Sequence, residues 1–150
     1  MRAVLQRVSE ASVTFADLPT RSIRHGLVVL VAVEPPDTPA DIEWLSGKIV
    51  RARIFDDEQG VMNRSVQEIG GDILVVSQFT LFASTRKGNR PSYSRSAPPE
   101  FARPQYEAFV ARVAQDLGRP VVTGEFGAQM RIHLVNEGPV TLIIDSRLKE

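Results

Sequence analysis

The sequence predicts an α/β (α+β) protein in which a mixed β-sheet packs against two main helices. Two aliphatic runs, at residues 26–33 and 73–76, are typical of strands that are covered on both faces. Apolar residues at helical spacing predict one helix after each of these runs. A length of 150 residues suffices for one domain, 1–150, with a core of its own.

The first half of the chain predicts two strands and a helix. Residues 3–15 alternate well enough to form a paired strand, although a break is expected at 9–11. The run at 26–33 ends at a Pro-Pro pair, because proline cannot donate a hydrogen bond to a ladder. Thr38 is the expected cap of the helix that follows, which extends to about Arg53.

The second half predicts short strands around a second helix. The strand that begins at Asp72 turns polar at residues 77–81, where it approaches its end. The second helix ends at Gly118, since glycine commonly follows the last helical residue. The apolar stripe of this helix consists of Tyr106, Phe109, Val110, Val113 and Leu117. Closing strands are expected at 121–123, 130–135 and 140–144.

Composition argues against several classes of protein. The 18 Lys+Arg balance the 18 Asp+Glu, and a net charge of zero disfavours a surface built to hold long nucleic acid. The absence of cysteine excludes disulfides and thiolate metal sites. No apolar run approaches the roughly 20 residues of a membrane span, and Arg7 interrupts the N-terminal run before a signal-peptide core forms. The sequence therefore predicts a cytoplasmic protein without a membrane segment.

Four residues directly follow the second aliphatic run: Ser77, Gln78, Phe79 and Thr80. The carboxyl end of a strand is a common place for a ligand in an α/β sheet. Gln78 adds to this interpretation, because an amide beside a buried run needs hydrogen-bond partners. On spacing alone, a strand that simply reaches the surface explains these residues as well.

The segment at 136–141 reads Asn-Glu-Gly-Pro-Val-Thr. Its residue types alone are explained by a tight turn between two strands. A functional interpretation is also open, because the backbone at Gly138 can approach a ligand closely and the bond to Pro139 can be cis. Two carbonyls held side by side there would receive an ammonium group.

A polar stretch between the halves of the chain carries four basic residues: Arg86, Lys87, Arg90 and Arg95. Such a stretch is either a solvated loop or a contact for the phosphates at a nucleic-acid end.

A Ser/His/acid triad is a weaker hypothesis. It would use Ser77 or Ser65, with His25 or His133 and an aspartate. The motif of a nucleophile elbow is absent, and a histidine that alternates with aliphatic residues, as His133 does, is typical of an ordinary strand.

The motifs at 77–81 and 136–141, in a chain that opens with Gln6-Arg7-Val8, together resemble the D-aminoacyl-tRNA deacylase family. The resemblance covers essentially the whole chain. Glu137 stands where the family more often has Asp, and Ala32 stands where Gly is usual. Further matching segments are Arg53-Ile54-Phe55, Met62-Asn63, Gly70-Gly71, Leu74-Val75-Val76 and Arg90-Pro91-Ser92.

The resemblance implies that family's fold, a homodimer whose sheets pair at the interface, and two active sites located there. It implies hydrolysis of the ester in D-aminoacyl-tRNA, and of glycine wrongly attached to tRNA, without a metal or organic cofactor. It places Phe79 and Thr80, together with Ser77 and Gln78, at the terminal adenosine and the scissile ester.

The same resemblance assigns roles to the second motif and the basic stretch. Gly138 and Pro139 form a cis bond in the family and project from one subunit into the other subunit's site, where they reject L-amino acids. Arg7 resembles the residue that steadies this pair, and Asn136 belongs to the same substrate-binding motif. The 3′ end of tRNA is expected to contact three basic residues: Arg86, Lys87 and Arg90.

Three alternatives remain open from the sequence. Thr80 can act as a nucleophile rather than through its backbone, although the sequence places no base beside it. A small dimeric module that binds RNA ends would bind tRNA without releasing an amino acid. A paralogous proofreader with a trans bond before Pro139 would hydrolyse a misplaced L-amino acid.

Overall fold

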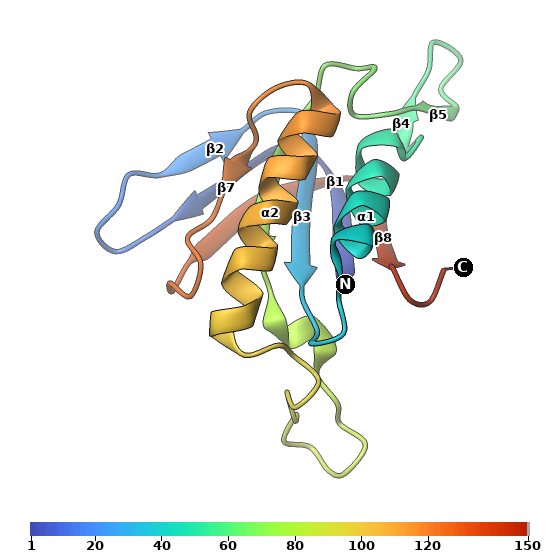
Figure 1. Cartoon of the computed structure of the whole chain (residues 1–150). Helices are drawn as coiled ribbons and strands as arrows, with labels where there is room; N and C mark the ends of the chain where they lie inside the picture. The colour runs from blue at the N-terminus through green and yellow to red at the C-terminus, as the bar shows by residue number, and fades with distance from the viewer. Residues whose placement is uncertain (150) are drawn as a thin grey trace.

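In the computed structural model, which describes residues 1–149, two helices lie on one side of a mixed six-stranded sheet (Figure 1). This arrangement confirms the predicted fold class. The elements in chain order are β1 (Arg2–Thr14), β2 (Arg21–Ile23), β3 (Gly26–Ala32), α1 (Pro39–Arg51), β4 (Phe55–Asp56), β5 (Met62–Arg64), β6 (Asp72–Ser77), the 3₁₀ helix η1 (Phe79–Phe82), α2 (Pro99–Leu117), β7 (Val122–Thr123) and β8 (Arg131–Asp145).

The sheet has the order β2-β1-β3-β6-β7, and β8 pairs with β1. β1 is antiparallel to β2, β3 and β8, whereas β3, β6 and β7 are parallel to one another. Because β3 and β6 run in the same direction, their carboxyl ends, Ala32 and Ser77, meet at one edge of the sheet. This edge carries the first of the two motifs.

β1 is one strand of 13 residues, so the break expected at 9–11 is wrong. The ladder to β8 instead shifts its register twice, between Gln6 and Val8 and between Val8 and Glu10. Such bulges bend a strand without ending it. The change of face that suggested a break is therefore a bend within a continuous strand.

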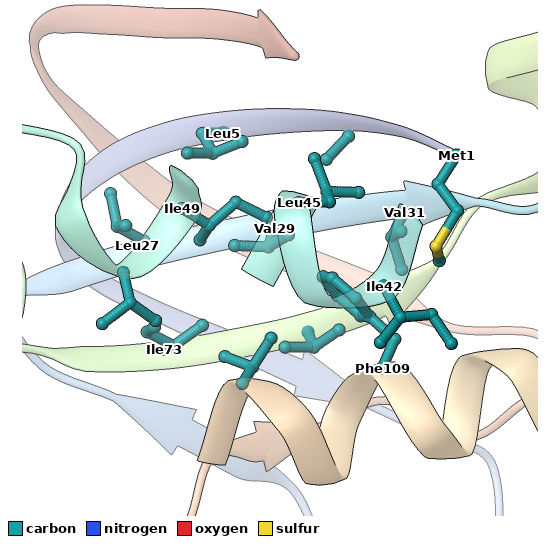
Figure 2. Close-up of a cluster of buried hydrophobic side chains, with 14 of the residues drawn as sticks. Met1, Leu5, Leu27, Val29, Val31, Ile42, Leu45, Ile49, Ile73 and Phe109 are labelled. Carbon is teal, nitrogen blue, oxygen red and sulfur yellow. The ribbon is translucent and has the colours of Figure 1, made fainter. Parts of the chain in front are cut away.

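The main core lies between the sheet and the helices (Figure 2). Leu45 and Ile49 of α1 and Phe109 of α2 are fully buried against the sheet. A second cluster covers part of the opposite face, because β2 contacts β6 and β7 and the sheet curls over itself. Adjacent residues of β3 and β6 are consequently buried on both faces, as predicted: Val28, Val29, Leu74 and Val75.

Both helices begin and end through local interactions. The carboxylate of Asp41 accepts hydrogen bonds from the backbone N–H of Thr38 at 2.9 Å and from its hydroxyl at 2.8 Å. These bonds satisfy groups at the exposed start of α1. α2 ends at Gly118, which has a φ of +81°. No helix in residues 1–149 is both long enough and apolar enough to span a membrane.

Candidate functional site

Residues 137–140 form an arch in the middle of β8. Gln6 of β1 pairs with Thr141, and Val8 pairs with Asn136, so four residues of β8 stand opposite Arg7 alone. The chain does not reverse here, and β8 continues on both sides of the arch. The expected tight turn between two separate strands is therefore wrong, because a large bulge produces the same turn-like sequence within one strand.

The side chain of Asn136 closes the base of the arch. Its Nδ2 donates to Oγ1 of Thr141 at 2.9 Å, and its Oδ1 accepts from the N–H of Val140 at 3.0 Å. Both ends of the amide are thus used inside the arch. Asn136, expected to bind substrate, has a supporting position here.

Gly138 and Pro139 lie exposed at the top of the arch, and the peptide bond between them is cis. Gly138 has a φ of +121°, in a region that L side chains rarely adopt. A Cβ at this position would meet Cγ2 of Val140 at 2.9 Å and a terminal nitrogen of Arg7 at 3.0 Å. Glycine is therefore required both by the backbone conformation and by the space beneath it.

Arg7 lies beneath the arch and is 7% exposed. Its Nε donates to the carbonyl of Glu137 at 3.1 Å. Its Nη1 donates to the carbonyl of Ile54 at 2.9 Å and to Oδ1 of Asp56 at 3.1 Å. Because a guanidinium is planar and rigid, these bonds connect the arch to the start of β4.

Glu137 adds a second connection to the arch. Its Oε2 lies 3.1 Å from Nε2 of His25, whose ring contacts the edge of Phe55 with 5.2 Å between centroids. Glu137 thus pairs with the residue directly before β3.

The first motif forms the turn at the carboxyl end of β6. The N–H of Gln78 donates to the carbonyl of Val31 at 2.7 Å, which anchors the turn to β3. η1 begins at Phe79, and the first N–H groups of a helix have no partner within it. Within residues 1–149, the backbone N–H groups of Phe79 and Thr80 make no hydrogen bond. The turn therefore presents two adjacent free donors.

The side chains of the first motif differ in their surroundings. Nε2 of Gln78 donates to the hydroxyl oxygen of Thr80. No histidine or carboxylate in residues 1–149 forms a hydrogen bond with Thr80, so the structure places no base beside its hydroxyl. The ring of Phe79 is 56% exposed and meets the ring of Tyr93 at 5.1 Å between centroids.

A cavity of about 570 Å³ opens beside this turn. Ser77, Gln78 and Phe79 line it on one side, and Tyr106 and Phe126 line it on another. Burial raises the pKa of Tyr106 to about 12, so its hydroxyl is neutral and donates to the carbonyl of Val75 at 3.1 Å. A volume in this range, with mostly apolar walls and a few polar groups, is typical of small-molecule sites.

Ala32 is both buried and part of the cavity wall. The packing change expected at this position therefore also affects the shape of the cavity.

The structure does not bring the two motifs together within one chain. The arch lies opposite Arg7, which pairs with Leu27 at the start of β3, whereas the turn lies beside Val31 near the end of that strand. The four residue steps of extended chain from Leu27 to Val31 span about 13 Å. Arg7 binds β4, which lies near the top of Figure 1, while the yellow-green turn after β6 lies near the bottom.

The basic stretch divides into two parts. Arg86, Lys87 and Arg90 are exposed on the loop that projects below η1 in Figure 1, and none of them forms an ion pair within residues 1–149. Arg95 instead pairs with Glu34 at 3.2 Å and is held against the body of the protein.

The histidines of the hypothetical triad have other partners. His25 pairs with Glu137, and His133 lies opposite Ser12 in the ladder between β1 and β8. No serine in residues 1–149 forms a hydrogen bond with either histidine, and no group of three His, Cys, Asp or Glu residues there is arranged to hold a metal ion.

Sequence reasoning missed several residues of the site. Tyr106 was part of a helical stripe, which indicates core but does not say that one end of the core opens into a cavity. Phe126 and Tyr93 lie in irregular segments without a periodic pattern, and Ser96 carries no signal in a serine-rich stretch.

Comparison with known proteins gives consistent results. A family model described as D-Tyr-tRNA(Tyr) deacylase matches residues 4–145. A D-aminoacyl-tRNA deacylase of Parabacteroides distasonis is 60% identical over 150 residues, which cover 100% of both chains. One of Opitutus terrae is 59% identical over the same length, again covering 100% of both chains.

Two solved structures are also similar to this chain. One, titled "c-Myc DNA Unwinding Element Binding Protein", has a TM-score of 0.91 and 38% sequence identity, and the match covers 97% of this chain and 98% of the other. The other is titled as an analysis of a probable eukaryotic D-amino acid tRNA deacylase. Its TM-score of 0.83 over 95% of this chain and 97% of the other, at 19% identity, shows a shared fold.

Proposed function

The chain belongs to the D-Tyr-tRNA(Tyr) deacylase family, and we propose that it hydrolyses D-aminoacyl-tRNA through the turn after β6 and the arch of β8. In this reaction water attacks the ester carbonyl, the bond to the ribose oxygen breaks, and free amino acid and tRNA are released. An ester is already an activated acyl group, so a positioned water and stabilisation of the oxyanion suffice.

The turn supplies the oxyanion donors in this proposal. The N–H groups of Phe79 and Thr80 are free of hydrogen bonds within residues 1–149. They belong to the turn beside the cavity, which in this proposal receives the terminal adenosine. Loss of one such donor typically costs several kcal/mol of transition-state stabilisation. The 2′-hydroxyl of the terminal ribose assists the attacking water, so the protein supplies no general base.

The arch supplies stereochemical selection. Enantiomers carry identical groups, so geometry alone separates them, and a rigid backbone is a more reliable reference than mobile side chains. Gly138 and Pro139 are exposed, and in this proposal their carbonyls receive the ammonium group of the substrate and leave no room for an L side chain. Glycine, which has no side chain, is accepted together with the D-amino acids.

A second copy of the chain brings the arch to the turn. The two motifs are separated within one chain, and Val4 and Ile143 pair on the face opposite to that of their neighbours Leu5 and Leu142, which pack with the helices. Ile143 is 72% exposed on this face. We place the dimer interface there, with one protomer's arch reaching its partner's cavity.

The projecting loop contacts tRNA beyond its terminal nucleotide. Arg86, Lys87 and Arg90 are exposed and free of ion pairs in residues 1–149, so they are available for phosphates. Since aminoacyl-tRNA is a cytoplasmic substrate, we place the reaction in the cytoplasm.

One observation carries the proposal: the two free amides of the turn, of which Phe79 also lines the cavity. The test is release of amino acid from D-tyrosyl-tRNA, L-tyrosyl-tRNA and glycyl-tRNA, each compared with the rate without protein. We expect acceleration with the first and third substrates alone. Binding of tRNA without any release would identify a binding module, and comparable release from L-tyrosyl-tRNA would refute selection by the arch.

A further inference from the structure

The hydroxyl of Ser96 donates to the carbonyl of Phe79 at 2.7 Å. This carbonyl and the N–H of Thr80 are the two ends of one planar trans peptide group. A hydrogen bond that fixes the carbonyl therefore also fixes the direction of the N–H. Thr80 carries one of the two free donors of the turn, and the bond from Ser96 constrains the peptide group of that donor.

The other donor of the turn is aligned differently. The N–H of Phe79 shares its peptide group with the carbonyl of Gln78, which accepts from the N–H of Leu81 at 3.2 Å within the turn itself. The carbonyl of Phe79, at the start of η1, receives in addition a hydrogen bond from a hydroxyl 17 residues further along the chain. Local geometry alone sets the first donor, whereas the second has a tertiary contact beside its local geometry.

The segment that carries Ser96 is itself held in place. The N–H of Ser96 donates to the carbonyl of Tyr93 at 3.0 Å, and the next N–H, of Ala97, donates to Val33 at 2.9 Å. Arg95 pairs with Glu34. The hydroxyl thus approaches Phe79 from a fixed base, and the bond is not an incidental contact of a mobile loop.

We propose that Ser96 is a positioning residue for the proposed hydrolysis, aiming the N–H of Thr80 at the developing oxyanion. This inference rests on the proposed function. Hydrogen bonding at the carbonyl also polarises the peptide group and strengthens its N–H as a donor. Ser96 acts through Thr80, although it also lines the cavity.

The test compares Ser96→Ala, Ser96→Thr and the control Ser94→Ala, using kcat and KM for D-tyrosyl-tRNA and the thermal midpoint of each variant. Ser94 lies in the same segment, but its hydroxyl contacts Ser92 rather than the turn. We expect Ser96→Ala to lower kcat about tenfold, because a misdirected donor weakens the transition state, while KM changes less than about twofold. Ser96→Thr keeps the hydroxyl and restores most of kcat, and Ser94→Ala matches the wild type.

A second measurement does not depend on activity. The amide resonance of Thr80 in isotope-labelled protein reports hydrogen bonding at the preceding carbonyl, so it shifts in Ser96→Ala and returns in Ser96→Thr. An unchanged resonance overturns the proposal, as does a normal kcat in Ser96→Ala. A rise in KM with kcat intact would make Ser96 a substrate contact instead, and equal losses in Ala and Thr variants would show that the hydroxyl is not responsible. If the wild type releases no amino acid, the proposed function itself fails.

Discussion

Thr80 has two groups that a substrate can contact, its hydroxyl and its backbone N–H, and their surroundings differ. Its hydroxyl accepts a hydrogen bond from Gln78, whereas its backbone N–H is free within residues 1–149. A nucleophilic hydroxyl needs a base to receive its proton. The environment of Thr80 therefore favours the backbone role over the side-chain role.

The substitution Thr80→Val separates these two roles. Valine has a similar shape and keeps the N–H, so we expect kcat within about tenfold of the wild type, the loss corresponding to one neutral hydrogen bond. The measurement is single-turnover hydrolysis of D-tyrosyl-tRNA by a variant whose thermal midpoint is normal. Complete loss of activity in a folded variant would support the nucleophile instead.

Gly138→Ala is predicted to damage the arch without unfolding the protein. An alanine needs a φ near +121° and places its Cβ against Arg7 and Val140, so the arch must shift. We expect kcat/KM for D-tyrosyl-tRNA to fall at least tenfold, with about 1–2 kcal/mol of lost stability from the left-handed backbone.

Gly60→Ala provides the matched control. Gly60 also has a positive φ, +76°, but a Cβ there meets no atom within 4 Å. The Gly60→Ala variant should be less stable than the wild type but should keep nearly all of its activity. Equal kinetic effects of the two substitutions would show that backbone strain, and not the position of the arch, is responsible.

Individual elements differ in how far the sequence could predict them. The ends of α1 and α2 were predictable, because capping and termination depend on neighbours such as Thr38 and Gly118. β2, β4 and β5 have two or three residues each, too few for any alternation to show. The arch was not predictable from local pattern, because a bulge and a turn use the same residue types and differ only in how the flanking strands pair.

The start of α1 carries a pH-dependent interaction. Burial opposes ionisation of Asp41, but hydrogen bonds from Ser146 and Thr38 outweigh it and lower the pKa of Asp41 to about 2. Since the folded pKa lies below the ordinary value of 3.8, this stabilisation is present above pH 4 and is lost as the pH falls toward 2.

Asp41→Asn should therefore destabilise the protein by about 1 kcal/mol near neutral pH, allowing for solvent screening, and by progressively less below pH 4. Chemical denaturation of both proteins at several pH values measures this difference. Asp17→Asn, in an exposed loop, is the control and should show a constant difference. A difference in unfolding free energy between the wild type and Asp41→Asn that stays constant in acid would contradict the lowered pKa of Asp41.

The loop between η1 and α2 is predicted to set the salt dependence of tRNA binding. Replacing Arg86, Lys87 and Arg90 by glutamine removes up to three phosphate contacts, and each contact contributes roughly 0.7–0.9 to the slope of log affinity against log salt. We expect weaker binding and a slope reduced by about 2. Lys48→Gln removes an exposed charge from α1 and should leave the slope unchanged, and an unchanged slope in the triple variant would return the loop to a purely solvated role.

At the scale of the whole molecule, the distance between the two motifs is the property that was least predictable from the sequence. Their residue types identified both of them, and the strand directions then place the turn and the arch toward opposite ends of β3. No pattern along one chain specifies a distance between two chains. The proposed homodimer explains this separation, because the turn of one protomer lies beside the arch of its partner in that arrangement.

This arrangement predicts that two inactive variants restore each other's activity. Phe79→Pro removes one of the proposed oxyanion donors at the first position of η1, where proline is tolerated, and Gly138→Ala distorts the arch. In a mixed dimer, one site combines both defects and the other combines the intact turn of one protomer with the intact arch of its partner. Random reassociation at equal amounts makes half of the dimers mixed, so activity should return to about a quarter of the wild-type value.

The measurement is hydrolysis of D-tyrosyl-tRNA after the two variants are produced together, compared with each variant alone and with the wild type treated identically. Mixed dimers are isolated by two different affinity tags, so that failure to associate is seen directly. If each site were built within one chain, every site in a mixed dimer would carry one defect. Mixed dimers without recovered activity would therefore show that the turn of one protomer and the arch of its partner do not form a shared site.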